Sequence, residues 1–197
     1  NAAKDAQVRI FPCDGRSVLD DEDEDWARDT PLFGPLHLAA EHNDTIALQM
    51  LLNKGVHVDV VTFESGNNTG DTALHYAARF DRLEAATLLL EQKANVDAFG
   101  WDGQTPLFRA QSANMTRLLL ARMADPNRED DLGNLPLLDA ASAGSLERVQ
   151  LLLGSKANPT LQHDAGCNAG KRVVDVLRKM ELSSAMIELV QFVVNEP

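Results

Sequence analysis

A pattern of about 33 residues recurs along this chain, and it constrains the fold more than any other feature of the sequence. The clearest copy, residues 67–97, reads NNTGDTALHYAARFDRLEAATLLLEQKANVD. It contains a turn, two short helix patterns with apolar residues at i, i+3 and i+4, and an extended exit. Neither helix is long enough to be stable alone in water. We therefore expect pairs of helices that stack on copies of one another.

Three further copies begin at residues 34, 100 and 133, and a weaker one follows residue 170. The position of His75 marks each copy, and the series is His37, His75, Phe108, Leu138 and Asp175, which gives spacings of 38, 33, 30 and 37 residues. The third copy lacks about three residues between Phe108 and its leucine run, close to one helical turn. We expect its first helix, or the turn after it, to be truncated.

The segments TALHYAA (72–78) and TPLFRA (105–110), each followed by a leucine run, resemble the ankyrin repeat. The resemblance covers about residues 31–194 and implies an all-α solenoid of helix–turn–helix units with β-hairpin fingers. It implies a repeat domain over 30–194, with repeats at about 31–61, 68–99, 100–128 and 131–160 and a degenerate capping repeat at 170–194. It also implies that His37 and His75 bridge backbone groups of neighbouring hairpins, and neither binds a metal nor acts as a base.

The residue after each second helix is a position where left-handed backbone is common. It is Gly55 in the first repeat, but Lys93, Met123 and Lys156 in the next three. If the left-handed conformation is kept, each of the three non-glycine residues carries strain of roughly 1 kcal/mol.

Residues 1–29 do not follow the repeat, and we expect an acidic N-terminal arm that is partly disordered. The apolar run VRIFP (8–12) is a candidate for an extended arm laid on the repeats. The run DDEDED (20–25) is either a solvated linker or an acidic tail that meets a basic surface, and both interpretations remain open.

The net charge of −12 argues against a nucleic-acid partner and against an anionic membrane surface. No apolar run approaches the roughly 18 residues of a membrane span. Cys13 and Cys167 form no C-x-x-C pair, which is typical of an intracellular protein, cytoplasmic or nuclear. Because the sequence opens on Asn1 without a signal-peptide pattern, we expect a fragment of a longer intracellular protein.

The sequence contains no phosphate-binding glycine loop, no nucleophile elbow and no H-E-x-x-H zinc motif. We therefore expect no enzyme activity, no cofactor and no metal site. The expected function is a protein-interaction module, monomeric by itself. The alternative is a direct regulator of an enzyme, such as a kinase inhibitor or an autoinhibitory domain.

In ankyrin-like arrays the partner usually meets the finger tips and the inner helices, and this resemblance nominates the candidate contact residues. On the fingers they are Phe63, Asp71, Phe99, Trp101, Asp102, Gln104, Asp131 and Leu132, and on the inner helices Glu41, His42, Arg79 and Phe80. Large apolar groups among acidic ones suit a partner that bears Arg or Lys beside an apolar anchor. For Trp101 we expect a partner contact and no place in the core.

Overall fold

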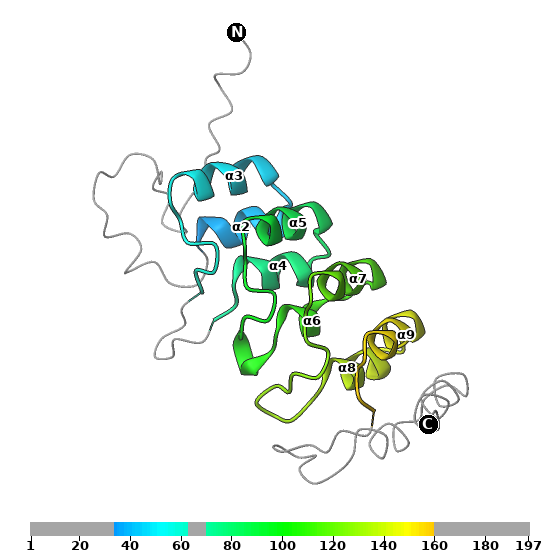
Figure 1. Cartoon of the computed structure of the whole chain (residues 1–197). Coiled ribbons are helices and arrows are strands. Elements are labelled where there is room, and N and C mark those ends of the chain that lie inside the picture. The colour runs from blue at the N-terminus through cyan, green and yellow to red at the C-terminus, as the bar shows by residue number, and fades with distance from the viewer. Residues whose placement is uncertain (1–33, 63–69, 160–197) are drawn as a thin grey trace.

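The computed structural model describes residues 34–62 and 70–159, and these residues form helix pairs in chain order (Figure 1). The pairs are α2 (Pro35–Glu41) with α3 (Thr45–Asn53), α4 (Ala73–Arg79) with α5 (Leu83–Glu91), α6 (Pro106–Arg109) with α7 (Ala113–Ala121), and α8 (Pro136–Ser142) with α9 (Leu146–Gly154). The 3-10 turn η1 (Trp101–Gly103) lies between the second and third pairs. This part of the chain confirms the expected all-α solenoid.

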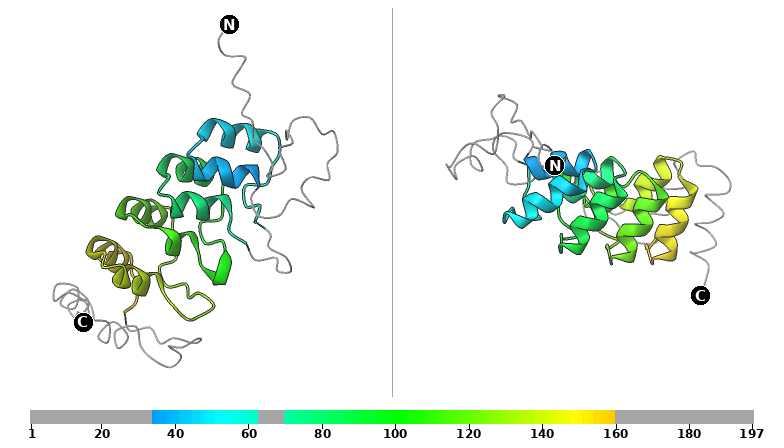
Figure 2. Two further views of the ribbon diagram at one scale, coloured as in Figure 1. Left: turned by 180° about the vertical axis from the view of Figure 1, so that it is seen from behind. Right: turned by 90° about the horizontal axis from the view of Figure 1, so that it is seen from above.

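The helices form two layers, with the inner helices α2, α4, α6 and α8 in one row and the outer helices α3, α5, α7 and α9 in the other (Figures 1 and 2). Small residues let the layers approach closely, since Ala77, Ala78, Ala85 and Ala86 are fully buried. Between repeats, the core is a column of leucines from the inner helices, each 1% exposed: Leu36, Leu74, Leu107 and Leu137.

A ladder of side-chain bonds joins each repeat to the next just after the outer helix. In each step a side-chain oxygen accepts a bond from a backbone N–H of the following repeat: Asp59 from Asn95 at 2.9 Å, Asp97 from Asp125 at 3.0 Å, and Asn127 from Asn158 at 2.7 Å. Since the bonds recur at one position of the repeat, they fix the register of the stack.

Fingers project from the side of the inner helices (Figure 1). The finger before α4 carries an isolated antiparallel bridge between Val61 and Thr72. The finger before α6 closes with a bond from the N–H of Gly100 to the carbonyl of Gln104, 2.8 Å long. Residues 63–69 of the finger before α4, the acidic arm and the expected capping repeat lie outside the described residues.

The expected left-handed backbone is present at every outer-helix exit that the structure describes. The φ angles are +91° at Gly55, +67° at Lys93, +70° at Met123 and +69° at Lys156. A second set of positive φ angles falls in the turn between inner and outer helices, at Asn43, Asp81 and Gly144.

The expected truncation falls in the inner helix of the third repeat. Helix α6 has 4 residues where α2, α4 and α8 have 7 each. The third position of the outer helix is Ala47 in α3 and Ala85 in α5, but Met115 in α7 and Arg148 in α9, and all four are buried.

Candidate protein interface

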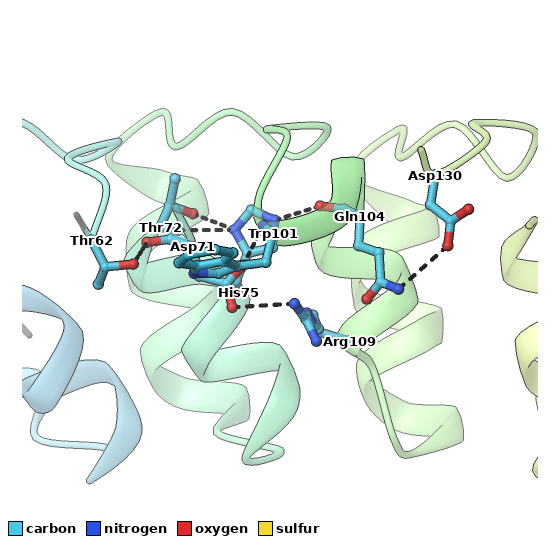
Figure 3. A network of polar contacts seen from close by, with 8 residues as sticks. All are labelled: Thr62, Asp71, Thr72, His75, Trp101, Gln104, Arg109 and Asp130. Carbon is cyan, nitrogen blue, oxygen red and sulfur yellow. Dashed lines mark hydrogen bonds and ion pairs between the residues drawn. The ribbon is translucent and has the colours of Figure 1, made fainter. Parts of the chain in front are cut away.

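His75 ties the start of α4 to the finger that follows it (Figure 3). Its Nδ1 accepts a bond from the N–H of Thr72, 3.0 Å away, so the proton is on Nε2. Nε2 donates to the carbonyl of Gln104 at 3.0 Å. The histidine therefore fixes the base of the finger, as the resemblance to ankyrin repeats implied, and Thr72 is the N-cap of α4.

His37 does the same for the first repeat, where its Nε2 donates to the carbonyl of Val60 at 2.9 Å. Burial lowers the pKa of both His37 and His75 below the ordinary value, and their bonds to carbonyl groups offset this only in part. Both rings are therefore neutral near pH 7. Phe108 and Leu138 hold the same position in the next two repeats and pack there as buried apolar side chains.

Asp71 was expected among the variable finger residues, and the structure contradicts that expectation. The residue is 4% exposed, and its carboxylate accepts a bond from the N–H of Trp101 at 3.0 Å. The same carboxylate pairs with the guanidinium of Arg109, 3.5 Å away on α6 (Figure 3). Asp71 therefore joins the second repeat to the third, and its carboxylate is not available to a partner.

Asp130 organises the finger before α8 in a similar way. It is 4% exposed and accepts bonds from the N–H groups of Leu132 at 3.0 Å and Asn134 at 2.7 Å. Neighbouring finger tips are joined directly, since the N–H of Asp131 donates to the carbonyl of Asp102 at 2.8 Å. These bonds hold the tips in fixed positions relative to one another.

Large apolar side chains are exposed on this fixed framework. Phe99 is 51% exposed, and the guanidinium of Arg128 from the next finger lies 5.0 Å from its ring centre. Leu132 is 56% exposed at the tip of that next finger. Phe80, at the end of α4, is 37% exposed and is covered in part by Arg79, whose guanidinium lies 5.6 Å from the ring centre.

The nominated charged residues also lie at the surface. Asp102 and Asp131 are exposed on neighbouring finger tips. His42 is exposed at the end of α2 and bonds through Nδ1 to the carbonyl of Leu38, while Glu41 is half-buried beside it. The carbonyl of Glu41 accepts a bond from Arg82 of the next repeat at 2.7 Å, so this backbone is held by the stack.

Two nominated residues are shared between the fold and the surface, and one cannot be placed. Trp101 begins η1 and is half-buried, and Gln104 is half-buried with its carbonyl bound to His75. Phe63 lies outside the described residues. Arg128 was not among the expected contact residues, and its only sequence signal is its place as a basic residue two positions before Asp130.

Within residues 34–62 and 70–159 no His, Cys, Asp and Glu side chains are grouped as metal ligands, and no helix has the length and apolarity to cross a membrane. A family model described as ankyrin repeats, three copies, matches residues 19–100 and 95–163. The chain belongs to the ankyrin repeat family. Repeats of this family generally mediate binding between proteins.

Three longer proteins contain a region similar to this chain. The chain is 36% identical over 155 residues to the mouse B-cell lymphoma 3 protein homolog, which is 73% of this chain and 34% of that protein. It is 33% identical over 135 residues to the Drosophila melanogaster tyrosine-protein kinase Shark, 66% of this chain and 14% of the kinase. It is 32% identical over 133 residues to human neurogenic locus notch homolog protein 1, 66% of this chain and 5% of that protein.

The chain thus spans about a third or less of the length of these relatives. What those proteins do as wholes does not pass to this chain with the shared repeats.

Proposed function

We propose that this chain is a non-enzymatic binding module whose partner, another protein, contacts the finger tips before α6 and α8 and the adjoining ends of the inner helices. The observation that carries the proposal is the pair of exposed apolar side chains, Phe99 and Leu132, on backbone held by buried carboxylates. Exposed apolar groups on a rigid support lose little entropy on binding. Such groups are common among residues that dominate binding energy.

The charges around these side chains indicate the chemistry of the partner. Asp102 and Asp131 are exposed beside Leu132, while the guanidinium of Arg128 is stacked on Phe99. The matching partner segment carries an apolar anchor flanked by Lys or Arg. Exposed charges act mainly on the rate of encounter, so association should slow as salt is added. The low use of cysteine supports an intracellular location, cytoplasmic or nuclear.

The test uses the whole chain as bait in a crosslinking pull-down, followed by quantitative mass spectrometry. The variant combines Phe99→Ser with Leu132→Ser. The control is Met123→Ser, which removes a side chain that is 83% exposed just after α7. Capture of the specific partner should fall at least about tenfold in the variant, a loss near 1.4 kcal/mol, and stay unchanged in the control. Equal capture by the wild type and the variant would refute the proposed surface.

The variant must remain folded for this result to be interpretable. Both substituted side chains are exposed, and loss of the contact with Arg128 costs at most about 1 kcal/mol of unfolding free energy. Trp101→Ala is a poorer probe, because a half-buried ring contributes to folding and binding at once.

Direct regulation of an enzyme is the second candidate function. Its support is the relative that is a tyrosine-protein kinase, because repeats similar to these occur in one chain with an enzyme there. If the captured partner is an enzyme, addition of the purified chain should change its activity in proportion to the fraction bound. Binding without a change in activity would leave the interaction module as the function.

A further inference from the structure

The outer helix of the first described repeat, α3, presents an isoleucine at one position where the other repeats present polar residues. At the second position of the outer helix α3 has Ile46, whereas the later repeats have Glu84, Asn114 and Glu147. Ile46 is 70% exposed, and Met50, one turn further along, is 48% exposed. An isoleucine this exposed, at a position otherwise polar, calls for an explanation.

The stack itself shows which way these side chains face. A groove between α3 and α5 is lined by Thr45 and Gln49 from α3 and by Glu84 and Leu88 from α5. Glu84 and Leu88 hold the same helix positions in α5 that Ile46 and Met50 hold in α3. In α5 these two positions face the preceding outer helix, α3. Since the repeats stack in the same orientation, Ile46 and Met50 face away from α5, toward the side on which a preceding repeat would lie.

The charge of the helix agrees with a covered face. From Thr45 to Asn53 α3 has no charged side chain, whereas each other outer helix that the structure describes has at least one. Lys, Arg, Asp and Glu are the side chains that normally face water. An outer helix without them, and with Ile46 and Met50 in a stripe, is built to be packed against.

We propose that the segment VRIFP (8–12) of this same chain covers the Ile46–Met50 face. In an extended segment Val8 and Ile10 point to one side and Arg9 to the other, so an apolar edge can lie on the stripe while the guanidinium stays in water. The 21 residues 13–33 that join this segment to Gly34 can span up to about 70 Å, and packed helices lie only about 8–10 Å apart.

Tethering favours this occupant over a second copy of the chain. A segment joined by a short linker acts at an effective concentration of the order of millimolar. A second copy at micromolar concentration would need an affinity about a thousandfold higher to compete.

A crosslinking experiment on the full chain tests the contact. Cys13 directly follows the proposed segment, and Cys167→Ser leaves it as the single thiol. Asn53→Cys then places a second thiol on the α3 stripe, and Ala121→Cys places one at the same helix position of α7, where it serves as the matched control. A short bismaleimide should join Cys13 to position 53 at least tenfold faster than to position 121.

Equal rates for the two sites would overturn the proposal. Crosslinks formed only between two chains, and diluted away at lower protein concentration, would assign the face to a second copy and also overturn it.

The sign of a stability change gives an independent test. On an open helix face, Ile46→Asp places an acidic residue in the first turn, where it is neutral or stabilising. On a covered face it should lower the melting temperature of the full chain. Ile10→Asp should lower the melting temperature too. The double variant should melt no lower than the less stable of the two single variants, because both substitutions break the same contact. A rise in melting temperature with Ile46→Asp, or additive effects of the two substitutions, would refute the contact.

Discussion

The left-handed residues at the helix exits make a sharp test, because two opposing backbone effects can be compared at neighbouring positions. Lys93 has φ +67° and an exposed side chain, and its N–H bonds to the carbonyl of Leu90 at 3.1 Å. Lys93→Gly keeps that bond and removes only a side chain that makes the left-handed conformation costly. Gln92, the residue before it, has φ −83° and is also exposed.

The magnitudes follow from the backbone alone. A side chain in left-handed backbone costs about 1–2 kcal/mol. Glycine's extra freedom in the unfolded chain costs about 0.5–1 kcal/mol. Lys93→Gly should therefore leave the unfolding free energy unchanged or raise it by up to about 1.5 kcal/mol, whereas Gln92→Gly should lower it by about 0.5–1 kcal/mol.

Urea unfolding of the full chain, followed both by circular dichroism and by tryptophan fluorescence, measures the difference. The two probes must give coincident transitions, because cooperativity can fail in repeat arrays. Gly55→Ala is the reverse control, since Gly55 has φ +91° and no atom within 4 Å of the added Cβ, so only the backbone term acts. If Lys93→Gly destabilises as much as Gln92→Gly, the strain at the exits is absent and the reasoning is wrong.

Three further predictions concern buried polar groups. Folding lowers the pKa of His37 and of His75, so near pH 6.5, the ordinary pKa of histidine, the unfolded chain binds more protons than the folded one. The free energy of unfolding should therefore fall as the pH is lowered from about 7.5 to about 5.5. A flat pH profile would show that neither ring changes its protonation on unfolding. Gly100→Ala should cost about 1–3 kcal/mol in urea unfolding, since its Cβ would lie 2.8 Å from Nε2 of His75 and closer still to a buried carboxylate, and a neutral effect would show that the finger can shift. Asp139→Ala should destabilise the protein by about 1–3 kcal/mol more than Arg148→Met. Loss of Asp139 leaves the Arg148 guanidinium, only 4% exposed, without the carboxylate oxygen that lies 3.0 Å from it. A lower urea midpoint for Arg148→Met than for Asp139→Ala would contradict this.

Local features of the chain were readable from the sequence because each depends on a few neighbouring residues. The spacing between Phe108 and the leucine run located the truncated helix α6, since one helical turn has a fixed number of residues. Glycine at position 55 marked the exit where Lys93 and Met123 also turn left-handed. The histidine position gave the bridges of His37 and His75, because the resemblance supplied the role of that position.

The candidate surface was only partly predictable. Phe99, Leu132, Asp102 and Asp131 lie exposed where the finger positions had placed them. For Asp71 the same positional argument was wrong, because the finger position does not reveal that Arg109 lies within 3.5 Å.

What only the tertiary structure decided are the contacts between unlike positions of neighbouring repeats. Two such contacts join residues that are about 30 positions apart in the sequence: Asp71 with Trp101, and Arg128 with Phe99. Each contact joins unlike positions of two fingers. Periodicity fixes where a residue lies within its own repeat, but which side chain it meets depends on how far one repeat is shifted and turned against the next. That shift is set by the packing of each repeat on its neighbours, so the finger position of Asp71 does not by itself reveal that its carboxylate is buried.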